Sequence, residues 1–346
     1  MPFFNQSVIN ESTTDDLPRC HEPSTSIEVF FMVSYSLVFL VGLLLNGFIL
    51  KFLLCQRQKS SRSIMIYLKN LIAADFLLSL CLPFDIINGA SNSMTIRVIY
   101  CNFGSTMFYL NMYTSILFMT YIAYNRYLKI IYSNKTHIIQ TVQGACIIST
   151  LTWICTLTIV TSYVSSSLIT QRNLTFIPSS CEELRSTNFN VFDIVFDTCV
   201  LVIFLYILAL IIFVYNRTSH KVSEVQQSQL TSSSSKKLAK SRRNMRVLVS
   251  VFCISFTPYQ LVNIFYDILG CSWSPVLNFL QEVTRVLSAV NICLDPFIYF
   301  IFCKDFREQL RLKNGFFLRR DTPELNMERG PQNETEPNIQ FSSESS

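Results

Sequence analysis

The chain has 346 residues, of which 50% are hydrophobic and only 15% are charged, and its mean hydropathy is +0.35. Ordinary soluble domains carry about 25% charged residues, so the composition argues against a water-soluble globular protein and predicts one that lies in lipid. The net charge of +5 is modest and the basic residues cluster in short loops, which argues against nucleic acid as a partner.

The first 26 residues are polar and lack the apolar run of about 7–15 residues that a cleavable signal peptide requires. We therefore expect residues 1–26 to remain as an extracellular N-terminus. Seven mostly apolar stretches follow, each long enough to cross a bilayer core of about 30 Å as a helix. They are residues 27–54, 64–91, 99–130, 142–169, 190–216, 244–270 and 276–303.

The sequence thus predicts an all-α protein, a seven-transmembrane helix bundle over residues 27–303. The stretch 222–243 is serine-rich and then basic, without an apolar period, which predicts a flexible cytosolic loop. Residues 304–314 alternate apolar and charged side chains at helical spacing, as in a short amphipathic helix on the inner membrane surface. We expect residues 315–346 to form a disordered cytosolic tail.

Lys and Arg residues favour one orientation of this bundle. They gather after the first and third stretches and between residues 217 and 246, whereas the alternate loops carry few. The positive-inside rule then places the N-terminus outside a multi-pass plasma-membrane protein. The glycosylation sequons at Asn5, Asn10 and Asn173 fall on the same outer side, and we expect them to be modified.

Four of the 12 cysteines lie in or beside the outer segments, where an oxidising environment permits disulfides. Four cysteines allow three pairings. In the pairing predicted here, Cys101–Cys181 ties the top of the third helix to the long loop after the fourth. Cys20–Cys271 then ties the N-terminal segment to the last outer loop.

Several short motifs stand in order along the apolar stretches. They are Leu45-Asn46-Gly47, the run NLIAAD that ends at Asp75, Asn125-Arg126-Tyr127, Trp153, Phe256-Thr257-Pro258-Tyr259 and the run NICLDPFIY from Asn291 to Tyr299. Together they resemble the landmarks of the rhodopsin-like (class A) G-protein-coupled receptors, over all seven segments. The resemblance implies a receptor that transmits an extracellular ligand signal to heterotrimeric G proteins, and not an enzyme.

Asp75 and Asp295 are carboxylates inside apolar segments, where an unpaired charge costs at least about 2.5–3.5 kcal/mol. They must face the bundle interior and find partners, for which Asn46, Ser115 and Asn291 are the candidates. The resemblance implies that Asp75, Ser115, Asn291 and Asp295 bind an allosteric sodium ion, the only cofactor we expect. A hydrogen-bonded water network is the alternative.

The resemblance also implies a switch that couples the bundle to the G protein. Its members are Arg126, Tyr215, Phe256, Pro258 and Tyr299. Here Asn125 replaces the acidic residue that usually precedes the arginine. This removes a salt-bridge partner of Arg126 and predicts raised basal activity, whereas the alternative is that Asn125 only forms hydrogen bonds.

Arg285 is a cation deep in the seventh stretch, where it requires either a protein carboxylate such as Asp197 or an anionic ligand. Glu282 to Arg285, and the third stretch around Tyr109, are similar to the purinergic nucleotide and lipid-mediator receptor cluster. We therefore expect an extracellular anionic small molecule such as a nucleotide; a lysophospholipid or constitutive activity without a ligand are the alternatives. The expected ligand-binding residues are Arg285, Phe108, Tyr109, Met112, Tyr113, Tyr259, Gln260, Asn263 and Gln281.

Two other classes of protein are disfavoured. A channel or transporter would also place carboxylates in the membrane, but the segments show no inverted repeat. An intramembrane hydrolase would need a protease-like motif around Asp75 or Asp295, and neither has one. The remaining expected partners are membrane lipid and, through phosphorylation of serines and threonines in the loop and tail, arrestin.

Overall fold

A computed structural model describes residues 25–55, 63–91, 93–132, 135–170, 181, 190–228, 233–269, 275–303 and 306–307. The chain falls into two compact units, Met1–Cys303 and Lys304–Ser346. The N-terminal segment, most of the amphipathic helix predicted at 304–314 and the tail predicted at 315–346 lie outside the described residues.

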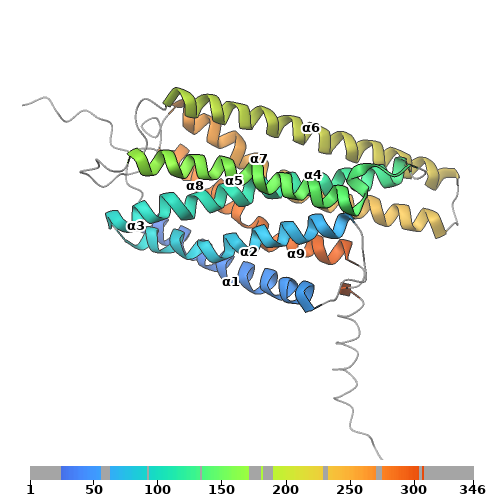
Figure 1. Cartoon of the computed structure of the whole chain (residues 1–346), viewed down its shortest axis with the longest axis horizontal. Coiled ribbons are helices and arrows are strands. Elements are labelled where there is room, and N and C mark those ends of the chain that lie inside the picture. Colours follow the sequence, from blue (N-terminus) through green and yellow to red (C-terminus); the bar gives the residue numbers. More distant parts are fainter. Residues whose placement is uncertain are drawn as a thin grey trace, which may run out of the picture. The chain divides into compact units, whose positions relative to one another are not determined.

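Long helices run side by side along one direction in the unit Met1–Cys303 (Figure 1). They are α1 (Thr25–Cys55), α2 (Ser63–Ala90), α4 (Ser105–Ile131), α5 (Val142–Thr170), α6 (Asn190–Ser228) and α7 (Ser233–Leu269), followed by α8 (Pro275–Ala289) and α9 (Asn291–Phe302). Short elements flank α4, namely α3 (Met94–Ile99), the π-helical turn η1 (Tyr100–Gly104) and the 3₁₀ turn η2 (Ile138–Gln140). The described residues form a helix bundle, as predicted.

Two of the rods that the described residues form are composite. α3, η1 and α4 follow one another without a break, so that they form a single rod, and α8 and α9 are separated only by Val290. The rod that contains α4 contacts α2, α5, α6 and α7 and therefore occupies the centre of the bundle.

The outward faces of the bundle are apolar. Large side chains such as Leu44, Tyr206 and Val276 are 71%, 70% and 62% exposed, which is unfavourable in water and expected against lipid. Within the described ranges, six helices are apolar and long enough to cross a membrane, counting α8 and α9 as one. The central α4 is not among them, because it buries polar residues such as Asn111, Thr114 and Ser115 within the protein.

The helices extend further than the apolar stretches predicted. α6 continues to Ser228, so the flexible loop predicted from residue 222 is wrong there. α7 already begins at Ser233, and the basic end of the predicted loop thus continues the sixth helix, the alternative that the sequence left open. Neither glycine nor proline interrupts the chain between residues 190 and 257. Each added residue therefore continues an existing helix at little cost, whether or not its side chain is apolar.

Asn46 on α1 replaces a backbone hydrogen bond that α9 lacks because residue 296 is proline. Proline has no N–H, so the carbonyl oxygen four residues earlier, on Ile292, lacks its usual helical donor. The Asn46 side-chain Nδ2 donates to this oxygen at 2.7 Å. From the sequence, Asn46 is a candidate partner for the buried carboxylates; in the structure, it instead connects α1 to the backbone of α9.

The start of α5 approaches the η2 turn closely at Gly144. A Cβ at this position would overlap the backbone carbonyl of Ile138, whereas a Cβ at Gly47 on α1 would meet its nearest neighbour, Phe76, at 3.7 Å. We expect Gly144→Ala to destabilise the protein by about 1–3 kcal/mol through overpacking. Gly47→Ala should be stabilising by about 0.5–1 kcal/mol, because it only removes backbone freedom.

Thermal unfolding of the purified protein in detergent measures both variants. If Gly144→Ala melted at or above the temperature of Gly47→Ala, the close approach between α5 and η2 would be wrong.

Candidate functional site

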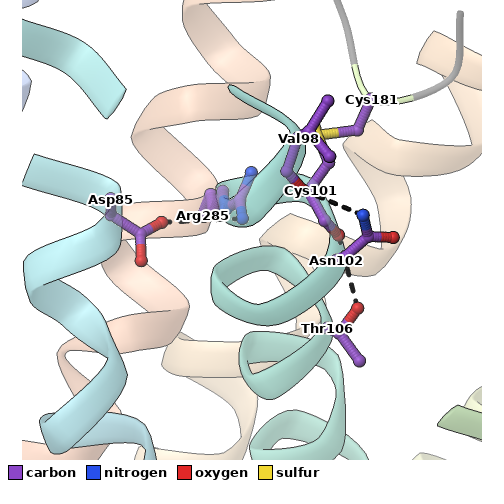
Figure 2. Close-up of a disulfide and its surroundings, with 7 residues drawn as sticks. All are labelled: Asp85, Val98, Cys101, Asn102, Thr106, Cys181 and Arg285. Carbon is purple, nitrogen blue, oxygen red and sulfur yellow. Dashed lines mark hydrogen bonds and ion pairs between the residues drawn. A yellow bond between two sulfur atoms is a disulfide. The ribbon is translucent and has the colours of Figure 1, made fainter. Parts of the chain in front are cut away.

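A disulfide links Cys101 in η1 to Cys181, whose Cα atoms are 5.4 Å apart (Figure 2). This linkage was predicted, and it marks one end of the bundle, which we call the disulfide end. The other predicted pair, Cys20–Cys271, lies outside the described residues, as do the sequons at Asn5, Asn10 and Asn173.

Arg285 on α8 lies close to this disulfide, in the interior of the bundle. Its guanidinium faces the carboxylate of Asp85 on α2, with 3.7 Å between Nη2 and Oδ1 (Figure 2). The two side chains are 12% and 5% exposed. From the sequence, Asp197 is the candidate protein carboxylate for Arg285; the ion pair that forms in the structure is with Asp85.

The pair is incompletely satisfied. A distance of 3.7 Å is beyond hydrogen-bonding range, and Nε and Nη2 of Arg285 have no hydrogen-bond acceptor among the described residues. The Asp85 Oδ2 atom likewise has no donor there. Buried polar groups normally find partners, so a second anionic group is the natural complement to this guanidinium.

Aromatic rings and a second acid surround the pair. The guanidinium carbon lies 4.9 Å from the ring centre of Phe108 and 5.5 Å from that of Tyr100. Glu282, one turn before Arg285 on α8, accepts a hydrogen bond from the Tyr35 hydroxyl at 3.4 Å. Glu282 also interacts electrostatically with Arg285, so a single cation is held near two carboxylates.

A small cavity of about 10 Å³, partly open to solvent, lies between α4, α6 and α7. Its lining includes six of the predicted ligand-binding residues: Tyr109, Met112, Tyr113, Tyr259, Gln260 and Asn263. Asp197 also lines it and was not predicted to do so. Arg285, Phe108 and Gln281 do not line it.

Phe108 contacts both this cavity and Arg285. Its ring is 5.4 Å from that of Tyr259, which lines the cavity, and 4.9 Å from the guanidinium of Arg285. The predicted residues are therefore divided between two neighbouring sites.

The predicted sodium ligands meet in the centre of the bundle. Asp75, Ser115, Asn291 and Asp295 are all fully buried. Asn291 donates to Asp295 at 2.8 Å, as predicted, but Asp75 accepts from Asn111 at 2.9 Å, a partner that the sequence analysis missed. Asp75 and Asp295 also interact electrostatically with each other.

Several oxygen atoms in this cluster have no hydrogen-bond partner among the described residues. Among the described residues none donates a hydrogen bond to Asp75 Oδ2, Asp295 Oδ1, Asn291 Oδ1 or Asn46 Oδ1, and the Ser115 hydroxyl has no partner there. Carboxylate, carbonyl and hydroxyl oxygens are the ligands that hard cations prefer. The residues therefore fit a small hard cation.

Asn125 and Arg126 lie at the end of α4 away from the disulfide. The Asn125 side chain donates to the Ser63 hydroxyl on α2 and to the Ile139 carbonyl in η2, both at 2.9 Å. Asn125 therefore forms hydrogen bonds, and raised basal activity stays a prediction. The Arg126 guanidinium lies over the ring of Phe302, with 4.7 Å to the ring centre.

The remaining predicted switch residues lie on α6, α7 and α9. Tyr215 on α6 accepts a hydrogen bond from Arg246 on α7 at 3.1 Å, a contact that the sequence analysis did not anticipate. Phe256 is fully buried, edge-on to Phe252 at 5.5 Å, and Tyr299 is also fully buried. Pro258 lies inside α7, two residues after Phe256.

The sequence did contain a signal for the missed acid. Asp85 lies in the second apolar stretch, where a carboxylate requires a partner for the same reason as Asp75 does. Phe302 carried no comparable signal, because an aromatic residue at the end of an apolar stretch is common.

Residues 45–299 match the model of a family described as "7 transmembrane receptor (rhodopsin family)". The chain is 35% identical over 289 residues to P2Y purinoceptor 14 of Bos taurus, and the aligned region covers 80% of this chain and 82% of that protein. It is 31% identical over 306 residues to G-protein coupled receptor 87 of Mus musculus (85% and 82% covered). It is 29% identical over 310 residues to probable G-protein coupled receptor 34 of Pan troglodytes (88% and 80% covered).

These matches extend across the helices that carry the ion pair, the cavity and the buried carboxylates, and the relatives are receptors and not enzymes. With a family match over more than half of its length and a bundle of the matching architecture, this chain belongs to the rhodopsin family of seven-transmembrane, G-protein-coupled receptors.

Proposed function

We propose that this receptor responds to an extracellular small molecule with a phosphate or carboxylate group, and that Arg285 binds that group. The observation that carries this proposal is the buried guanidinium with two nitrogen atoms, Nε and Nη2, that have no acceptor among the described residues. Arg binds phosphate and carboxylate through paired N–H donors. A ligand anion would compete with Asp85 for the same cation.

The disulfide end then faces outward, with the N-terminus extracellular and the Arg126 end in the cytosol. The distribution of Lys and Arg supports this orientation. The similarity to a P2Y purinoceptor makes purine nucleotides the first ligands to test. We also propose that the phosphorylated tail recruits arrestin and that Asn5, Asn10 and Asn173 are glycosylated.

Ligand binding to the purified receptor tests the proposal. Thermal unfolding of the wild type and of Arg285→Ala is recorded with purine nucleotides and with lysophospholipids. The control is Arg97→Ala on α3, which removes another cation at the disulfide end. An anionic ligand should raise the melting temperature of the wild type and of Arg97→Ala, and not that of Arg285→Ala. Equal shifts in both variants would exclude Arg285 as the anion site.

We further propose that the buried cluster of Asp75, Ser115, Asn291 and Asp295 binds sodium. Two carboxylates in one apolar interior repel each other unless a cation or proton compensates them. The oxygens without hydrogen-bond donors support a cation there. Binding would stabilise the arrangement in which these oxygens lie close together.

Sodium should therefore raise the melting temperature of the wild-type receptor relative to choline at the same ionic strength, by mass action on the folded state. Asp75→Asn should lose this difference. The control is Glu224→Gln, which removes an exposed acid at the far end of α6 and should keep it. Identical melting temperatures in sodium and choline would contradict the site.

A further inference from the structure

The cavity between α4, α6 and α7 has a negatively charged residue in its lining, whereas Arg285 nearby is positively charged. Among the residues that the structure describes, Asp197 is the only charged one in its lining. Three tyrosines, Tyr109, Tyr113 and Tyr259, line the same space. The cavity is therefore suited to a positive group and not to an anion.

The tyrosines form a connected aromatic wall. Tyr109 and Tyr113 are stacked, with 6.2 Å between ring centres, and the Tyr259 hydroxyl donates to the Tyr109 hydroxyl at 3.3 Å. Aromatic faces attract ammonium groups, and the attraction grows when water is excluded. A carboxylate beside such a wall adds charge-assisted hydrogen bonds from the N–H groups.

The anion site and this cavity are adjacent. Tyr109 interacts electrostatically with both Arg285 and Asp197, and the ring of Phe108 lies near both the guanidinium and Tyr259. One small ligand can therefore reach both charges if its own two charges are separated by a short chain.

We propose that Asp197 and the three tyrosines form an ammonium subsite, so that the ligand carries an amino group in addition to the anion that binds Arg285. Only the contact between the anion of the ligand and Arg285 rests on the proposed function; the contact between the amino group and Asp197 does not. The carboxylate of this subsite, Asp197, lies on α6. Residue 108 on α4 is a phenylalanine and supplies no carboxylate.

Three soluble probes separate the two contacts in binding experiments on the purified full-length receptor. Phosphoethanolamine carries both charges, ethyl phosphate lacks the amine and ethanolamine lacks the phosphate. We expect the wild type to bind phosphoethanolamine at least about tenfold more tightly than ethyl phosphate, the gain expected of one charge-assisted hydrogen bond.

Asp197→Asn should remove that preference and Asp197→Glu should restore most of it. The matched control Glu224→Gln, on the same helix and away from the cavity, should keep it. The comparison of probes on the wild-type chain does not depend on how well any variant folds.

The outcomes separate the two proposals. Equal binding of phosphoethanolamine and ethyl phosphate, both lost in Arg285→Ala, would overturn the ammonium subsite and leave the anion site standing. Binding of phosphoethanolamine and ethanolamine that is unaffected by Arg285→Ala would support the subsite and overturn the anion site. Binding of none of the three probes would overturn both.

Discussion

Replacing Asp85 by Asn is expected to lower the stability of the receptor and at the same time to tighten the binding of an anionic ligand. Asp85 is the carboxylate in the buried ion pair with Arg285. Removing one partner of such a pair typically costs about 3–5 kcal/mol, because the other charge stays buried without compensation. An anionic ligand would supply that compensation, so its stabilising effect should be larger in the variant.

Thermal unfolding with and without the ligand measures both effects. Glu282→Gln is the matched control, because Glu282 is a second acid near Arg285 that bonds to Tyr35 instead of forming the ion pair. It should lower stability less. If Asp85→Asn weakened ligand binding, Asp85 would be a ligand contact and not a competitor of the ligand.

Replacing Phe302 by Leu is expected to raise basal G-protein activation by about two- to tenfold, the factor that corresponds to a partly buried cation–π contact. The Arg126 guanidinium lies over the Phe302 ring. Asn125 cannot replace this contact with a salt bridge, since it is uncharged and donates to Ser63 and Ile139. Removing the ring should therefore remove one of the contacts that keep Arg126 in this position and favour its contact with the G protein.

G-protein dissociation in cells, without added ligand and at matched surface expression, measures the basal activity. Phe302→Tyr keeps the ring and should behave as the wild type. Phe297→Leu changes an outward-facing phenylalanine on the same helix, 57% exposed, and should also be silent. An increase in all three variants would point to a general loosening of α9 instead of the Arg126 contact.

The helices were predictable from the sequence because the signal for each is local. About 20 apolar residues in a row determine a spanning helix whatever its neighbours are. The helix ends were less predictable, as α6 and α7 show, since polar residues such as those between 217 and 228 continue a helix equally well once it has formed.

The partners of individual residues were predictable only in part, because they depend on how the helices are rotated and staggered. Asn291 and Asp295 are one turn apart on the same helix, and their contact follows from helical spacing. Asp85 and Arg285 are brought together by α2 and α8 from distant parts of the chain. A choice between Asp85 and Asp197 therefore required the fold.

The role of Arg285 in signalling is the central claim, and G-protein dissociation in cells tests it most directly. The ligand found by the binding experiments is applied to the wild type, Arg285→Ala and Arg97→Ala at matched surface expression. We predict that the wild type and Arg97→Ala respond and that Arg285→Ala does not. A full response of Arg285→Ala at the wild-type ligand concentration would contradict the anion site, and with it the proposed class of ligand.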